Sequence, residues 1–190
     1  MPSSRQTRQE PKDTGSLLEC ARVYRRMGWV PIPLRPHDKR PLISWEAYQS
    51  QVPSDEEITA WFERSPNANI GIVTGAISQL VVLDVDPAHG GAESLEVLEA
   101  QNSPIEPTIK ALTGGGGRHF YFRYPGFVLN NRTGIAPGLD IRADGGYVVA
   151  PPSIHPSGRA YVWANGHEPG AAKLAALPPW LLELALGGRI

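Results

Sequence analysis

Length, composition and charge already narrow what this chain can be. Its 190 residues, 41% of them hydrophobic, are enough for one substantial core. The 18 Lys and Arg residues nearly balance the 19 Asp and Glu residues, so no global positive field exists to hold nucleic acid unspecifically. A single cysteine, Cys20, excludes an intramolecular disulfide, and neither a signal-peptide core nor a membrane-length apolar run is present, so we expect a cytoplasmic protein without membrane contact.

The N-terminal part of the chain predicts a tail, two helices and an edge strand. Residues 1–13 are polar and lack apolar periodicity, so we expect a flexible tail before a single folded domain over 14–190. Apolar residues at helical spacing predict a first helix that stops at Gly28, and the proline-containing stretch WVPIPL after it is typical of an edge strand. A capping box predicts a second helix over 54–65.

The remainder of the chain reads as apolar strands and helices joined by turn residues. The expected strands are NIGIVTG, LVVLDVD, TIKALT, RHFYFRY, GLDIRA, GYVVAPPS and AYVWA, and the expected helices are GAESLEVLEAQN and PPWLLELAL. Most strands of the second half follow one another through glycine turns. The pattern therefore predicts a mixed α/β domain whose second half is mainly antiparallel sheet.

An acidic pair ends one of the most apolar strands. Asp84 and Asp86 are two residues apart, so in a strand they project from the same face, with their Cα atoms about 7 Å apart. Two like charges held this close raise each other's pKa unless a cation lies between them. Taken alone, the pair is equally consistent with a solvated strand end at which Asp86 and the following proline begin a turn.

Two later strands carry polar groups on one face and apolar groups on the other. GLDIRADGG places Asp140 and Arg142 together, and RHFYFRY places His119, Tyr121 and Arg123 together. A half-buried sheet built from these strands can gather three aspartates, a histidine and an arginine on one side. Three carboxylates suit Mg²⁺ or Mn²⁺, whereas one cysteine and scattered histidines offer no zinc spacing.

Four consecutive glycines, residues 114–117, precede His119. They do not form a Walker A loop, because the Lys-Ser/Thr pair is missing. One interpretation is a flexible hairpin loop. The other is a loop in which Gly116 and Gly117 let a triphosphate approach backbone N–H groups, with His119 donating to a phosphate oxygen.

In their order along the chain, these segments resemble a known family. KRPLISW, NIGIVTG, LVVLDVD, GGGGRHFYF and GLDIRADGGYVVAPPSIHPSG are similar to the bifunctional DNA primase/polymerase (prim-pol) domain of the archaeo-eukaryotic primase superfamily. The resemblance extends from about residue 28 to about residue 163. It implies an α+β fold in which an RRM-like, mainly antiparallel catalytic sheet packs with a second small α/β unit, and we assign the helix over 54–65 to that second unit.

The resemblance also implies roles for the acidic and basic residues. Asp84 and Asp86 match the family's catalytic Asp-x-Asp pair, and Asp140 matches its later hydrophobic-Asp motif, so the three are expected to be catalytic and to bind two Mg²⁺ or Mn²⁺ ions. His119 matches the histidine of the small-x-His motif and is expected to contact the phosphates of the incoming nucleotide. Arg142 is expected to help hold the triphosphate.

Further residues are weaker candidates for contact with the substrate. The family often has serine at the position of Gly117, so a hydroxyl contact is absent there. Ser153 and His155 resemble a family loop near the site and are candidates for nucleotide contact. Lys39, Arg40 and Arg118 are candidates for contact with template or nucleotide phosphate, and for Lys39 and Arg40 a solvated loop is the alternative.

The function implied by the resemblance is template-directed nucleotidyl transfer by a two-metal mechanism, as a DNA primase, a DNA polymerase or both. The expected partners are NTP or dNTP, a single-stranded DNA template with its primer, and a helicase domain or protein. One alternative is a nucleotide- or DNA-binding module of a larger helicase-primase that is inactive alone. Another is an Asp-x-Asp glycosyltransferase, which leaves the Asp140 strand and the glycine loop without roles.

Overall fold

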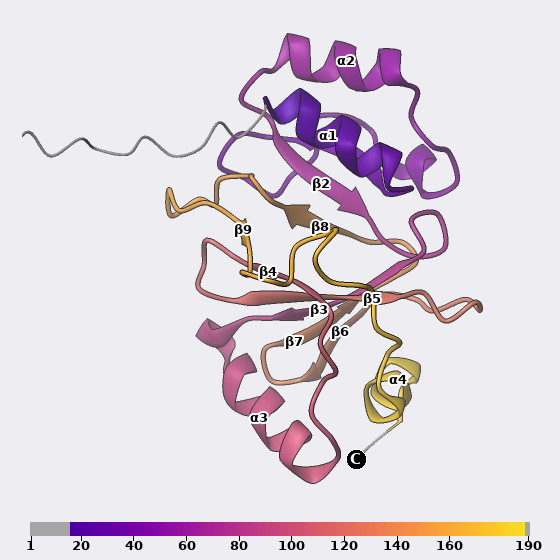
Figure 1. The fold of residues 1–190 in the computed structure, drawn as a ribbon, viewed down its shortest axis with the longest axis vertical. Coiled ribbons are helices and arrows are strands. Elements are labelled where there is room, and N and C mark those ends of the chain that lie inside the picture. Colours follow the sequence, from indigo (N-terminus) through magenta and orange to yellow (C-terminus); the bar gives the residue numbers. More distant parts are fainter. Residues whose placement is uncertain (1–15, 189–190) are drawn as a thin grey trace, which may run out of the picture.

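Two antiparallel sheets form the framework of the protein (Figure 1). The computed structural model describes residues 16–188, so the predicted tail lies outside the described residues. The smaller sheet has the order β1-β2-β8, with β1 (Val30–Leu34), β2 (Asn69–Val73) and β8 (Tyr147–Ala150). The larger sheet has the order β6-β7-β3-β5-β4-β9, with β3 (Leu80–Val85), β4 (Ile109–Leu112), β5 (Arg118–Arg123), β6 (Arg132–Ala136), β7 (Leu139–Arg142) and β9 (Val162–Trp163). The predicted α+β class is confirmed.

Two helices, α1 (Leu17–Arg26) and α2 (Asp55–Arg64), pack against the smaller sheet at the upper end of the molecule in Figure 1. The capping box of α2 is present, since the Ser54 side chain accepts from the Glu57 N–H and the Glu57 carboxylate accepts from the Ser54 N–H. Gly28 adopts a φ of 83°, which favours glycine directly after α1. As predicted, the helix over 54–65 belongs to the smaller unit.

The opposite face of the larger sheet is covered by α3 (Gly91–Gln101) and α4 (Pro179–Leu186), which lie at the lower end of the molecule in Figure 1. Side chains of alternate residues on β3 separate into two cores. Val81, Leu83 and Val85 pack with the α3 and α4 side chains, and Leu80 and Val82 pack with the side chains between the sheets. No helix within residues 16–188 is long and apolar enough to cross a membrane.

Strand β8, predicted as a strand from GYVVAPPS, pairs antiparallel as expected, but the sequence left open which sheet it joins. Its residues pair with β2, with Ile70 opposite Ala150, so the chain returns to the smaller sheet after β7. Val148, Val149 and Ala150 are all buried, so both faces of β8 are covered. Such a continuous apolar pattern indicates a buried strand but does not say which sheet it joins.

Candidate active site between the two sheets

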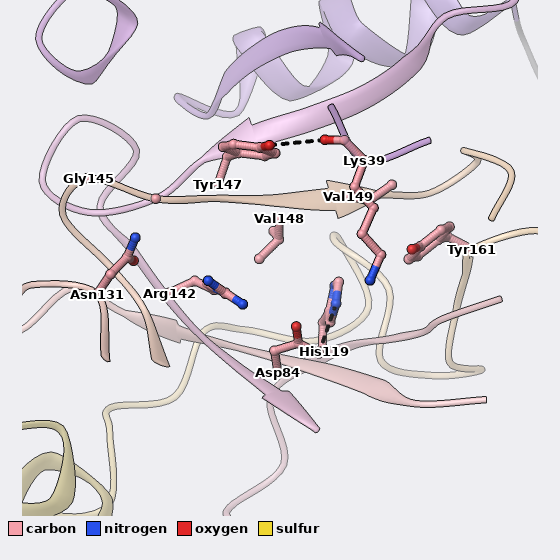
Figure 2. A pocket seen from close by; sticks show the side chains of 11 residues that line it. Lys39, Asp84, His119, Asn131, Arg142, Gly145, Tyr147, Val148, Val149 and Tyr161 are labelled. Atoms are coloured by element: carbon pink, nitrogen blue, oxygen red, sulfur yellow. Dashed lines mark hydrogen bonds and ion pairs between the residues drawn. The ribbon is translucent and has the colours of Figure 1, made fainter. Parts of the chain in front are cut away.

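Two adjoining cavities lie between the sheets. The first, here called the Arg142 cavity, has a volume of about 220 Å³ and is walled on one side by β8 and on the other by β3 and β5 (Figure 2). The second, here called the Asp86 cavity, has a volume of about 230 Å³ and reaches the glycine loop between β4 and β5. Both are lined by Lys39, Asp84, His119 and Tyr161, so these four side chains mark the place where the cavities meet.

Asp84 and His119 face each other across neighbouring strands. They are register partners in the β3–β5 pair, and His119 Nε2 lies 3.4 Å from Asp84 Oδ1. Burial alone raises the pKa of Asp84, but hydrogen bonding to His119 and the charges of His119, Arg142 and Lys39 outweigh it and hold that pKa below its ordinary value. Asp84 is therefore ionised at neutral pH although most of its side chain is buried.

The other two predicted carboxylates lie close to Asp84 but have different partners. Asp86 lines the Asp86 cavity beside Asp84, while its carboxylate accepts from the Ala88 N–H at 2.9 Å and contacts His89 Nδ1 at 2.8 Å. Asp140 is the register partner of Asp84 on β7, which places the two side chains on one face about 5 Å apart at Cβ. Its carboxylate is directed to the backbone N–H of Gly134 and to Arg142, and it lines neither cavity.

The donor chemistry of these carboxylates fits a hard divalent cation. Oxygen ligands are what Mg²⁺ and Mn²⁺ prefer, and the side chains of Asp84, Asp86 and Asp140 are 26%, 49% and 28% exposed. Within residues 16–188, however, no three His, Cys, Asp or Glu side chains are gathered as a ligand set. The three carboxylates are thus the type of ligand that these ions prefer. In this structure, however, Asp86 and Asp140 are hydrogen-bonded to other protein groups.

Arg142 provides the positive charge of the first cavity. Its guanidinium lies 2.7 Å from Asp140 and lines the cavity wall. Asn131 lies beside it and accepts from the Ala143 N–H at 2.7 Å, which fixes the turn that connects β7 to β8. A Cβ on Gly146 would lie 2.3 Å from the Asn131 amide oxygen, so only glycine lets this turn approach so closely.

Lys39 is brought to the site by a loop of the smaller sheet, residues 35–41. The Tyr147 hydroxyl donates to the Lys39 carbonyl at 3.0 Å, and the side-chain amide of buried Asn69 donates to the Asp38 carbonyl at 3.1 Å. Figure 2 shows the Lys39 side chain reaching between His119 and Tyr161. Within residues 16–188 its ammonium forms no ion pair, in contrast to neighbouring Arg40, which pairs with Asp38.

The glycine loop is ordered by its own hydrogen bonds. The N–H groups of Gly116 and Gly117 donate to the carbonyl and to the hydroxyl of Thr113, both at 2.9 Å. In this structure both amides are therefore bonded within the loop, and Gly117 also lines the Asp86 cavity. A Cβ on Gly117 would lie 2.4 Å from the Val85 carbonyl, so the loop packs against the end of β3 where a serine would not fit without movement.

Two predicted contact residues do not reach the cavities. The Ser153 side chain is buried and its hydroxyl accepts from the Ile70 N–H at 2.8 Å, so it joins its loop to β2 instead of facing a nucleotide. Arg118 lies on the face of β5 opposite to His119, with its guanidinium 5.6 Å from the centre of the Phe120 ring. His155, in contrast, lines the Asp86 cavity.

Sequence reasoning missed three residues that line the site. Tyr161 lies in both cavities, Tyr147 and Asn131 in the first. The glycine pair in GLDIRADGGY is a signal for the turn beside Tyr147. No sequence motif around Tyr161 or Asn131 indicates a site residue, because their place in the cavities depends on how segments distant in the sequence pack together.

An antiparallel sheet that presents carboxylates, a histidine and cations to one enclosed space is suited to group transfer at phosphate. The family model of the bifunctional DNA primase/polymerase N-terminal domain, Prim-Pol, matches residues 21–180, so this chain belongs to that family. Its members perform nucleotidyl transfer of the DNA primase/polymerase type, act on nucleotides and DNA, and generally depend on a divalent metal. No curated protein matches the chain at the level of sequence.

Proposed function

We propose that this chain performs template-directed nucleotidyl transfer, extending a primer on single-stranded DNA with NTP or dNTP by a two-metal mechanism, as the catalytic domain of a replication protein. One observation carries the proposal: cationic and acidic side chains border two cavities that meet at the Asp84–His119 contact. A substrate with several phosphates requires cations to hold it and carboxylates to hold its metal ions. Here both lie within one space.

The Arg142 cavity suits the triphosphate of the incoming nucleotide. Arg142 and Lys39 supply positive charge from opposite sheets, and His119 lies between them on the floor of the cavity (Figure 2). Charge-assisted hydrogen bonds to phosphate oxygens are stronger than neutral ones, and partial burial strengthens them further. We therefore assign phosphate binding to these three residues, and the Arg142–Asp140 ion pair fixes the guanidinium for that role.

The acidic side suits two divalent ions held by Asp84, Asp86 and Asp140. When bound, such ions offset phosphate charge and favour ionisation of the attacking hydroxyl. Asp84 is prepared for this role because it is ionised and fixed between β5 and β7. Asp86 can turn from exposed His89 without disturbing the core.

The reaction assigned to the site is an in-line displacement. The primer 3′-hydroxyl oxygen forms a bond to the α-phosphorus, the bond from that phosphorus to the bridging oxygen breaks, and pyrophosphate leaves with the electron pair. The hydroxyl proton passes to solvent. The protein mainly positions the groups, which is what residues on rigid strands do well.

Primer extension tests the proposal. Purified chain is incubated with a labelled primer on a DNA template and with NTP or dNTP, in Mg²⁺ or Mn²⁺, beside an Asp84→Asn variant. We expect extension by the wild type and a loss of at least about a thousandfold in the variant, because an ionised ligand is removed. A folded wild type that binds nucleotide but never extends the primer would favour a binding module that requires further domains. A parallel assay of dinucleotide synthesis without primer separates priming from extension.

A further inference from the structure

Tyr161 has a buried ring that separates two histidines. The residue is 2% exposed and lies immediately before β9, and its backbone N–H donates to the Ser153 carbonyl. The ring centre lies 6.1 Å from that of His119 and 5.9 Å from that of His155. Because Tyr161 lines both cavities, it forms part of the boundary between them.

The hydroxyl of Tyr161 has no protein partner within residues 16–188, yet it is not sealed from the cavities. The fully enclosed polar side-chain atoms without a partner are His119 Nδ1 and the Tyr121 hydroxyl, and Tyr161 is not among them. Figure 2 shows the Tyr161 oxygen turned toward the Lys39 ammonium and His119. Buried tyrosines normally place their hydroxyl on a partner, so an open, unpaired hydroxyl on a buried ring indicates a ligand.

The other tyrosines of the chain behave differently. Four have hydroxyls that donate to protein oxygens: Tyr24, Tyr48, Tyr124 and Tyr147. The Tyr121 hydroxyl is enclosed within the core. Tyr161 therefore combines two properties that no other tyrosine here combines, an unpaired hydroxyl and access to the site.

We propose that Tyr161 is a nucleotide-binding residue whose hydroxyl donates to a phosphate oxygen of the incoming nucleotide where the two cavities meet, beside the Lys39 ammonium. This assignment rests on the proposed function. A phosphate oxygen accepts hydrogen bonds and carries negative charge, so it matches a hydroxyl and an unpaired ammonium that share one wall. A position at the boundary also places the contact near Asp84, where the phosphates and the metal ligands must come together.

The environment keeps this hydroxyl a donor. Burial, helped by the negative charge of Asp84, raises the pKa of Tyr161 to about 12. The phenol is thus protonated throughout the neutral and mildly alkaline range. Such a donor contributes to phosphate binding without adding a further positive charge beside Lys39.

Tyr161→Phe tests the proposal, because it keeps the ring between the two histidines and removes only the hydroxyl. We expect the nucleotide KM in primer extension, and the Kd of nucleoside triphosphate measured without primer, to rise about 10- to 100-fold. The melting temperature should stay the same or rise, since no protein hydrogen bond is lost. Tyr24→Phe is the matched control: it loses its bond to the Pro151 carbonyl, so its melting temperature should fall while KM and Kd stay at wild-type values.

The outcomes separate the two proposals. If the wild type extends the primer and Tyr161→Phe has unchanged KM and Kd, the role of Tyr161 is overturned while the proposed function stands. If both variants weaken nucleotide binding equally, the effect is one of general packing, which also overturns it. If the wild type neither binds nucleotide nor extends primer although it is folded, both proposals fall.

Discussion

The side chains around the two cavities differ in how strongly hydrogen bonds and ion pairs constrain their positions. Asp84 is fixed by strands on both sides and by its contact with His119. The backbone of Lys39 is fixed by hydrogen bonds at its N–H and its carbonyl, but its ammonium has no ion pair within residues 16–188. A pre-positioned backbone with a free charge is suited to bind a mobile anion, because little further ordering is needed.

Lys39 and its neighbour Arg40 provide a matched pair of substitutions. Lys39→Gln should raise the nucleotide KM about tenfold, because a charge-assisted contact is lost. Arg40→Gln should change it less than about twofold, since Arg40 pairs with Asp38 and lines neither cavity. Steady-state extension at graded nucleotide concentrations measures both. Equal effects in the two variants would indicate a response to net charge and contradict a specific contact.

At the scale of elements, the loop of residues 35–41 depends on one carboxylate. Asp38 accepts from the N–H groups of Lys39 and Arg40 and from the Arg40 side chain. These hydrogen bonds, those from Arg40 first, lower the pKa of Asp38 to about 2. Because the folded pKa lies below the ordinary value near 4, the stabilisation is complete above about pH 4 and is lost as pH falls through about 2.

This pH dependence can be followed directly. The amide resonances of Lys39 and Arg40 should shift with a midpoint near pH 2 in the folded protein, and an Asp38→Asn variant should show no such transition. The measurement is a series of two-dimensional NMR spectra between about pH 5 and about pH 1. A midpoint near pH 4 would mean that the carboxylate is not bonded as described.

Local patterns predicted most elements because each has a local cause. The capping box of α2 and Gly28 after α1 act within a few residues, and alternation along β5 separates His119 from Phe120 whatever the sheet order. The partner of β8 is decided by tertiary packing, so the local pattern left it open. Strand β6 was not predicted, because its residues are partly exposed and its register with β7 is irregular.

Of the residues in the candidate site, only those that belong to recognisable sequence motifs could be predicted. Asp84, Asp86 and His119 were expected together and line one cavity, whereas Ser153 and Arg118 are directed elsewhere. A hydroxyl can serve a ligand or a neighbouring strand, and the sequence does not distinguish the two. Tyr161 was missed for the converse reason, since its neighbours in space come from distant segments.

At the scale of the whole molecule, a shared core joins the two sheets. Trp29, just before β1, stacks on Tyr121 of β5, with ring centres 5.6 Å apart and planes 7° apart. Side chains of α1, α2, β2 and β8 pack in the same cluster as those of β3, β4 and β5. Neither sheet buries its inner face without the other, so we propose that they form one folding unit.

Unfolding in urea tests this unity. We expect one transition, with the same midpoint by tryptophan fluorescence and by far-ultraviolet circular dichroism, because loss of either sheet exposes the shared core. Trp29→Leu should lower the midpoint of both signals together. Two separated transitions would show that the sheets are independent domains.

The cavities also have a consequence for the protein while it is being made. Their walls are taken from residues as far apart as Lys39 and Tyr161, and β8 must return to the smaller sheet before the upper wall exists. During translation, Asp84 and Asp86 are synthesised early. The cavity wall that β8 and Tyr161 provide forms only when nearly the whole domain has left the ribosomal exit tunnel. Incomplete chains are therefore expected not to bind nucleotides.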